Sequence, residues 1–353
     1  LETNNFSMIE EIRSIFYSSD HFIIRSIVSE TEKIYIFDKD GKTFSVINKK
    51  GRGPDEYTMI YSIDVNKDTL TILSVNKINE YTFNGKLIRS ILIDNVKMPF
   101  GYSQVEKLDG CHYILTPILG TQRQYKYSAV ILDNKANFKL LFSYPESEVE
   151  IAKNSNSYTK SLKSVNIFSY KGLGKAISGD NEYILTHNKS YQRIDTIYKI
   201  NFGKYQVTKE NIATKNKISK IVSIVHPPLE SENYIFFNIS LSGAAHKPMK
   251  MRSRSGRDYI LPSSCSIYDK RDGSFRLIDQ PEDYQKGFID DFEGGPAFWP
   301  QHISGDEHMV SFINAMDFIE YAQTHKVSDK FKKIADGLKE SSNPVVVLVK
   351  LKK

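Results

Sequence analysis

The chain has 353 residues, 40% hydrophobic and 25% charged, and its 48 basic and 42 acidic residues give a formal net charge of +6. This composition excludes a disordered or collagen-like chain. The positive charge is small and spread along the chain, so we expect no nucleic-acid partner. No apolar run is long enough to span a membrane. We therefore expect no membrane span in this sequence, and because the chain begins at Leu1 and not at Met, a removed export signal or a lipid anchor outside this sequence, the only membrane contact we expect, stays open.

The residue types indicate a β-rich fold, because 21 Tyr and 20 Phe stand against a single Trp. The only two cysteines, Cys111 and Cys265, form no Cys-x-x-Cys pair. A zinc cluster or a thioredoxin-like redox site is thereby excluded, whereas a disulfide between the two stays open.

A hairpin pattern repeats along the chain. Residues 34–42 and 78–86 each read as an alternating strand followed by Asp-Gly or Asn-Gly, the strongest short-range hairpin signal. Looser copies occur near residues 128–142, 196–207 and 266–278. Two further strand-like runs precede each hairpin, so the unit is four antiparallel strands, which is typical of a β-propeller blade.

We therefore predict an all-β fold, a single six-bladed β-propeller domain spanning residues 1–353, with a helical insertion at 314–341 in its last blade. The expected blades lie near residues 11–48, 61–92, 102–143, 165–209, 218–279 and 297–353. The last blade shows only three strands. Because a propeller closes as a ring, we expect its missing outer strand to come from the N-terminus, at or before residues 1–3.

The first predicted blade is followed by Lys50-Gly-Arg-Gly-Pro-Asp-Glu-Tyr57. This segment resembles one found in six-bladed β-propeller lipoproteins of Gram-negative gut anaerobes, which are similar to NHL-repeat propellers. Residues 1–3, 195–198, 298–300 and 343–345 resemble other parts of the same family. The resemblance implies an exported protein, periplasmic or a lipoprotein of the outer membrane or cell surface. It implies no activity, because most members are uncharacterised.

Five residues are candidates for binding. Arg52 between two glycines could grip an anion with Glu56 and Tyr57 as neighbours, although the same segment could simply be a tight crossover between blades. Trp299 and His302 are expected near the inner strand of the last blade, where an aromatic ring more often packs than binds.

Other motifs carry little chemistry. His302 and His308 supply two metal ligands where zinc needs about three, and residues 290–295 lack the calcium-loop spacing, so we expect no metal and no cofactor. There is no Gly-x-Ser-x-Gly nucleophile motif. The basic run at 247–257 is expected as an exposed loop, either a solvated hairpin or a contact for an anionic headgroup, a polysaccharide or a partner.

The sequence thus favours a monomeric, non-catalytic, exported binding or interaction propeller, whose ligand is an unknown protein or carbohydrate. One alternative is a lyase or hydrolase with its site in the central channel, since a propeller can assemble a site from several blades without a local motif. The other is a cell-surface scaffold that uses the basic loop and the last-blade helices.

Overall fold

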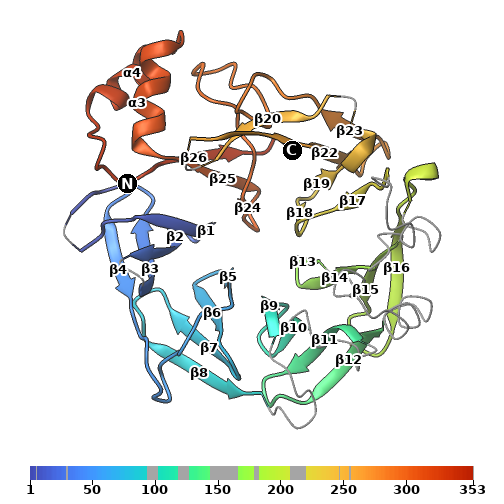
Figure 1. Cartoon of the computed structure of the whole chain (residues 1–353). Coiled ribbons are helices and arrows are strands. Elements are labelled where there is room, and N and C mark those ends of the chain that lie inside the picture. The colour runs from blue at the N-terminus through green and yellow to red at the C-terminus, as the bar shows by residue number, and fades with distance from the viewer. Residues whose placement is uncertain are drawn as a thin grey trace.

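The fold is a closed ring of six β-sheets around a central axis (Figure 1), which confirms the predicted six-bladed propeller. It is seen in a computed structural model that describes residues 1–4, 6–28, 31–93, 102–117, 127–143, 166–178, 183–206, 220–245, 247–253 and 256–352. All strand pairs within the blades are antiparallel, as the alternating hairpin pattern predicts. Gly41 and Gly85 hold the hairpin turns of the first two blades at φ of +77° and +80°.

The first four blades each have four strands in chain order. Blade 1 contains β1 (Glu11–Ser18), β2 (His21–Val28), β3 (Thr31–Asp38) and β4 (Thr43–Ile47). Blade 2 contains β5 (Ser62–Asn66), β6 (Thr69–Leu73), β7 (Lys77–Thr82) and β8 (Leu87–Leu92). Blade 3 contains β9 (Tyr102–Lys107), β10 (His112–Pro117), β11 (Tyr127–Asp133) and β12 (Phe138–Ser143). Blade 4 contains β13 (Ile167–Tyr170), β14 (Leu173–Ile177), β15 (Tyr183–His187) and β16 (Ile194–Lys199).

The last two blades are elaborated. Blade 5 contains β17 (Ser223–Ile224), β18 (Leu229–Glu230), β19 (Tyr234–Ser240), β22 (Ser263–Asp269) and β23 (Phe275–Ile278), with an inserted hairpin of β20 (Met249–Arg252) and β21 (Asp258–Leu261). Two short 3-10 turns flank this blade, η3 (Gly203–Tyr205) and η4 (Ser242–Ala244). Blade 6 contains β24 (His302–Ile303), β25 (His308–Ile313) and β26 (Val345–Lys350), with α3 (Ala315–Thr324) and α4 (Asp329–Asp336) between the last two strands.

The antiparallel order gives the ring two different ends. In each blade, the connection between the first and second strands lies at one end of the ring, which we call the turn end. The connection between the third and fourth strands lies at the same end in the blades where a fourth strand is described. The second-to-third connections and the crossovers between blades leave at the other, which we call the insertion end. The β20–β21 hairpin and α3–α4 are both second-to-third connections, so the described insertions enter and leave the ring at this end.

Apolar clusters between neighbouring blades form the core. One cluster joins Ile34 of blade 1 to Ile72 of blade 2, the next joins Leu73 to Tyr113 of blade 3, and comparable clusters fill the following seams. A blade cannot bury both faces of its own sheet, so stacking against its neighbours supplies the burial that stabilises the ring.

The part of the expected closing strand that falls within this sequence is not observed. Residues 1–3 form no strand beside β26, whose sheet has the order β24-β25-β26 in the part of the chain described. The N-terminal segment instead lies against Asn343, just before β26. The Asn343 side chain accepts the Ile9 N–H at 2.9 Å and donates to the carbonyls of Glu2 and Ser7, both at 2.6 Å. Val310 of β25 packs among blade 1 side chains and completes the seam.

The two helices pack together on the outer side of blade 6 (Figure 1). The rings of Phe318 and Phe331 stack at 3.9 Å between centroids, and Ser328 caps α4 by accepting the Phe331 N–H. No helix among the described residues has the length and apolarity needed to cross a membrane.

Candidate functional site

The segment from Lys49 to Ile60 is a tightly built crossover from blade 1 to blade 2. Glu56 folds back on its own loop, where its Oε2 accepts the Gly53 N–H at 2.7 Å. A Cβ on Gly51 would lie 2.0 Å from the same oxygen, so a side chain at that position would displace the Glu56 carboxylate. Tyr57 is 1% exposed and belongs to the core between blades 1 and 2, and burial raises the pKa of its hydroxyl.

Side chains of strand β7 hold this crossover in place through three hydrogen bonds to its backbone carbonyls. Asn79 donates to the carbonyl of Glu56 at 3.1 Å, the Tyr81 hydroxyl donates to the carbonyl of Asp55 at 2.8 Å, and Lys77 donates to the carbonyl of Gly53 at 2.9 Å. Arg52 is exposed and makes no ion pair with a described residue. The structure therefore brings Glu56 and Tyr57 into a structural joint and leaves Arg52 on its surface.

Trp299 lies in the core between blades 5 and 6. Its ring packs against Phe236 and Phe288, with centroids 5.8 Å and 5.6 Å away, and it is 6% exposed. Its indole N–H has no hydrogen-bond partner among the described residues. The segment around Gly287 approaches closely, because a Cβ on Gly287 would lie 2.1 Å from the carbonyl oxygen of Phe298.

His302 begins the inner strand of blade 6 and meets blade 1. Its Nδ1 accepts the Tyr17 N–H at 3.4 Å, and its ring lies 4.9 Å from that of Phe16. Burial disfavours the charged ring and lowers its pKa to about 4. His308 instead pairs with Asp306 at 2.9 Å. The two histidines form no metal site, and no cluster of three His, Cys, Asp or Glu side chains suited to a metal occurs in the described part of the chain.

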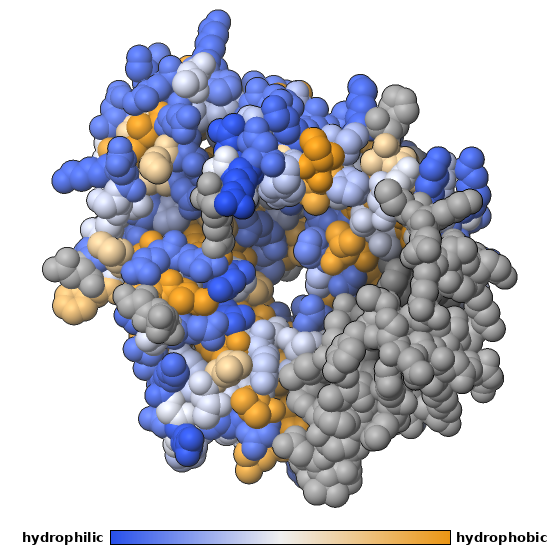
Figure 2. Space-filling view, viewed as in Figure 1, coloured by the Kyte–Doolittle hydropathy of each residue, from blue (hydrophilic) through white to orange (hydrophobic). Residues whose placement is uncertain are grey.

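The inner strands carry buried carboxylates that sequence reasoning missed. Asp64 on β5 accepts the Lys107 N–H of β9 at 2.8 Å, and Glu106 on β9 accepts from the Ser169 hydroxyl of β13 at 2.8 Å. Burial raises the pKa of Asp64 to about 6, and burial together with the charge of Asp64 raises the pKa of Glu106 well above its usual range. Each of these hydrogen bonds joins two blades around the opening that Figure 2 shows at the centre of the ring.

Two further buried charge clusters join blades. Glu80 of blade 2 is fully buried and binds Arg89 at 3.0 Å, Lys107 at 2.7 Å and the Tyr113 hydroxyl at 2.8 Å. Glu230 of blade 5 lies between two ammonium groups, Lys175 at 2.7 Å and Lys270 at 3.1 Å. In both clusters one buried carboxylate pairs with two cations, at least one of them from the neighbouring blade, which gives the clusters a structural role.

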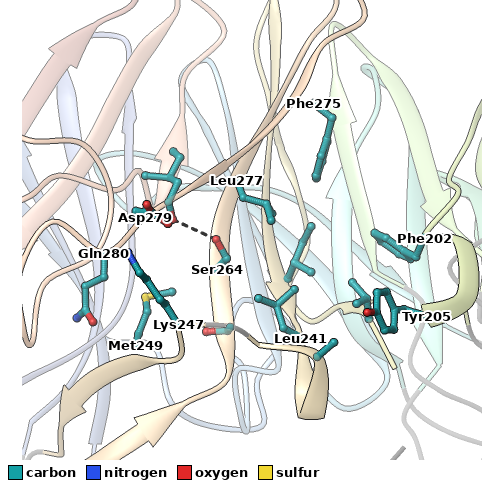
Figure 3. A pocket seen from close by; sticks show the side chains of 15 residues that line it. Phe202, Tyr205, Leu241, Lys247, Met249, Ser264, Phe275, Leu277, Asp279 and Gln280 are labelled. Carbon is teal, nitrogen blue, oxygen red and sulfur yellow. Dashed lines mark hydrogen bonds between the residues drawn. The ribbon is translucent and has the colours of Figure 1, made fainter. Parts of the chain in front are cut away.

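A groove of about 600 Å³ opens at the insertion end, on the face of blade 5 that is turned toward blade 4 (Figure 3). Aromatic and aliphatic side chains make up most of its wall. They come from the segment after β16, the end of β19, the insertion after it and the outer strand β23, and include Phe202, Tyr205, Leu241, Met249, Phe275 and Leu277.

The groove has a polar end. Lys247, Asp279 and Gln280 lie together at this end in Figure 3, away from Phe275 and Tyr205. Gln280 is committed to the fold, because it accepts the Lys250 N–H and donates to the Lys250 carbonyl, both at 2.9 Å. Lys247 and Asp279 are exposed and make no hydrogen bond or ion pair with a described residue. An apolar trough with free opposite charges at one end is suited to a ligand with an apolar body and a charged group.

The sequence signalled only Lys247 of this groove, as the first residue of the basic run. Part of that run forms β20, where Lys250 pairs with Asp283 and Arg252 pairs with Asp258 of β21, whereas Arg254 of the run lies outside the described residues. The other groove residues are scattered from 202 to 280, so no local motif could reveal them. Both cysteines are free thiols, Cys111 exposed and Cys265 buried.

Comparison with known proteins shows a family and a fold. Residues 1–350 match the model of a family described as a domain of unknown function, DUF4934. No curated protein matches the chain. A crystal structure named "putative exported protein", from Bacteroides fragilis NCTC 9343, is 16% identical, covers 100% of this chain and 94% of its own, and has a TM-score of 0.67.

More remote propellers are also similar. The WD40 domain of Pan2 from Neurospora crassa is 9% identical over 76% of this chain and 65% of its own, with a TM-score of 0.39. YCF48 from Cyanidioschyzon merolae is 10% identical over 89% of this chain and 82% of its own, with a TM-score of 0.40. Scores this low carry no argument about function.

Proposed function

We propose that this chain, which belongs to the DUF4934 family, is an exported, non-catalytic binding propeller whose ligand occupies the blade 5 groove. The observation that carries the proposal is the groove itself, an apolar trough of about 600 Å³ with the free charges of Lys247 and Asp279 at one end. Ligand sites are typically concave and mostly apolar, with a few polar groups that orient the ligand.

The exported setting has separate support. The similar Bacteroides fragilis structure is named as an exported protein, and the Gly-Arg-Gly-Pro segment resembles that of propeller lipoproteins. We propose a location in the periplasm or at the cell surface, with a lipid anchor outside this sequence. Metabolic labelling of the native protein with a radioactive fatty acid tests the anchor, and a protein that takes up no label and fractionates with the cytoplasm would contradict it.

The binding proposal is tested by thermal unfolding of the purified chain with panels of peptides and glycans. A ligand at about 100 times its Kd stabilises the fold by about 3 kcal/mol, a readily measured rise in Tm. Leu277→Asp places a charge in the groove, whereas Leu92→Asp makes the same change on the exposed outer strand of blade 2. We expect a ligand to stabilise the wild type and the Leu92 variant but not the Leu277 variant. A shift equal in all three proteins, or no shift with any panel member, would refute the proposal.

A further inference from the structure

We infer that the groove accepts an extended segment of a partner polypeptide, which adds to blade 5 as a further strand beside β23. The inference rests on the proposed function and specifies its ligand. It combines three features of the same place: a sheet edge with no neighbouring strand among the described residues, an apolar face directly beside that edge, and charges at one end of the groove that pair with no described residue.

Strand β23 is the outermost strand of blade 5, and no described strand pairs with its outer edge. The Asp269 N–H donates to the Ser274 carbonyl at 2.9 Å, and the Ser264 hydroxyl donates to the Ile278 carbonyl at 3.1 Å, so the even-numbered residues face β22. By the alternation of an antiparallel ladder, the N–H and C=O groups of Phe275 and Leu277 point away from β22. They form a template that another backbone can pair with.

The side chains of the same two residues enter the groove. Phe275 and Leu277 are 48% and 55% exposed, which is high for large apolar residues on one sheet face. An added strand places every second side chain on this same face. These side chains would enter the space bounded by Phe202 and Tyr205 on the far wall (Figure 3). The inferred segment therefore has apolar side chains at alternate positions.

Charge complementarity selects among such segments. The Lys247 ammonium at the polar end has no described anionic partner and can pair with a carboxylate. The Asp279 carboxylate lies at the same end and can pair with an ammonium or guanidinium group, whereas Arg276 on the opposite face is already paired with Asp272 at 3.9 Å. The favoured segment thus alternates apolar residues and has an acidic and a basic residue near one end.

The test uses an octapeptide library with apolar residues at alternate positions and an acidic and a basic residue at one end, screened by fluorescence polarisation against the whole chain. Peptides that bind are then resynthesised with single backbone N-methyl groups, which remove one N–H each. We expect N-methylation at alternate positions, those facing β23, to weaken binding about tenfold or more for each bond lost, and N-methylation at the intervening positions to leave it unchanged. This experiment needs no variant of the protein.

Protein variants provide a matched pair. Leu277→Pro removes an outward N–H from the edge, where proline is tolerated, and should weaken peptide binding about tenfold. Leu92→Pro does the same on β8, because the Ile93 N–H donates to the Asn76 carbonyl and directs the Leu92 N–H away from β7. The Leu92 variant should bind as the wild type does.

Three outcomes would overturn the inference. Binding that is insensitive to N-methylation at every position would show that the groove takes side chains without strand addition. A groove that binds only glycans would refute the peptide ligand yet leave the proposed binding function standing. A concentration-dependent dimer of the free chain that disappears in Leu277→Pro would assign the edge to a second copy of this protein.

Discussion

Asn343 latches the first residues of the chain to the last blade, and its replacement by alanine should destabilise the whole ring. The side chain is 1% exposed and makes three hydrogen bonds, to the N–H of Ile9 and to the carbonyls of Glu2 and Ser7. Alanine removes all three and leaves the Ile9 N–H and the Ser7 carbonyl without these partners inside the seam, whereas the Glu2 carbonyl still accepts the Ser7 hydroxyl at 3.2 Å. At about 1 kcal/mol for each net bond, with a further cost for the unpaired groups, we expect a loss of about 3–4 kcal/mol.

Two companion variants sharpen this test, which is read by urea unfolding followed by circular dichroism. Asn343→Asp keeps the acceptor for Ile9 but turns a carboxylate oxygen toward two carbonyls, so it should cost at least as much as alanine. Asn314→Ala removes an exposed asparagine that makes no capping bond, and should change stability by less than about 0.5 kcal/mol. If Asn343→Ala also stayed within about 1 kcal/mol of the wild type, the latch would not hold the ring closed.

Three further outcomes are expected. The pKa of His302 is about 4 in the folded state against an ordinary 6.5, so between these pH values the folded chain binds fewer protons than the unfolded chain. The free energy of unfolding should therefore fall as the pH drops from 6.5 to 4, by at most about 3 kcal/mol because part of the residue is exposed. His302→Gln should flatten a plot of the unfolding free energy against pH. Gly51→Ala should lower the free energy of unfolding by about 1–2 kcal/mol in chemical denaturation, because the flexible end of Glu56 can move aside. Gly287→Ala should lower it by more, because Gly287 has a φ of +108° and a backbone oxygen would lie 2.1 Å from the new Cβ. Equal losses in the two variants would contradict this explanation. Glu80→Gln leaves a buried lysine without its counter-ion and should cost about 3–5 kcal/mol, which a calorimetric scan showing an unchanged Tm would disprove.

The repeat pattern predicted the ring because each propeller blade is built from strands that are neighbours in the sequence and pair as hairpins. The strand alternation and the Asp-Gly and Asn-Gly turns lie within about ten residues of each other, so the chain order alone discloses them. Closure could not be predicted in the same way. It depends on one amide side chain, Asn343, which contacts residues 334 or more positions away.

The candidate site was harder still. Tyr57 and Trp299 are aromatic residues at places that suit either packing or binding in the sequence, and the structure places both in apolar cores, 1% and 6% exposed. The groove depends on how blade 4 faces blade 5, which no single segment encodes. Asp64 and Glu106 likewise acquire their shifted pKa values only when neighbouring inner strands meet.

The seam between blades 1 and 6 has a consequence for how the protein comes to be folded. Each other seam joins blades that are consecutive in the chain and can form as soon as both have been made. The closing seam must wait until Asn343 has been made, 334 residues after Ile9, and until then Ile9 and the blade 1 surface that Val310 later covers remain open to solvent. The nascent protein therefore exposes one apolar sheet face while all the other blades are being made, and that face is where a chaperone would have the longest opportunity to act.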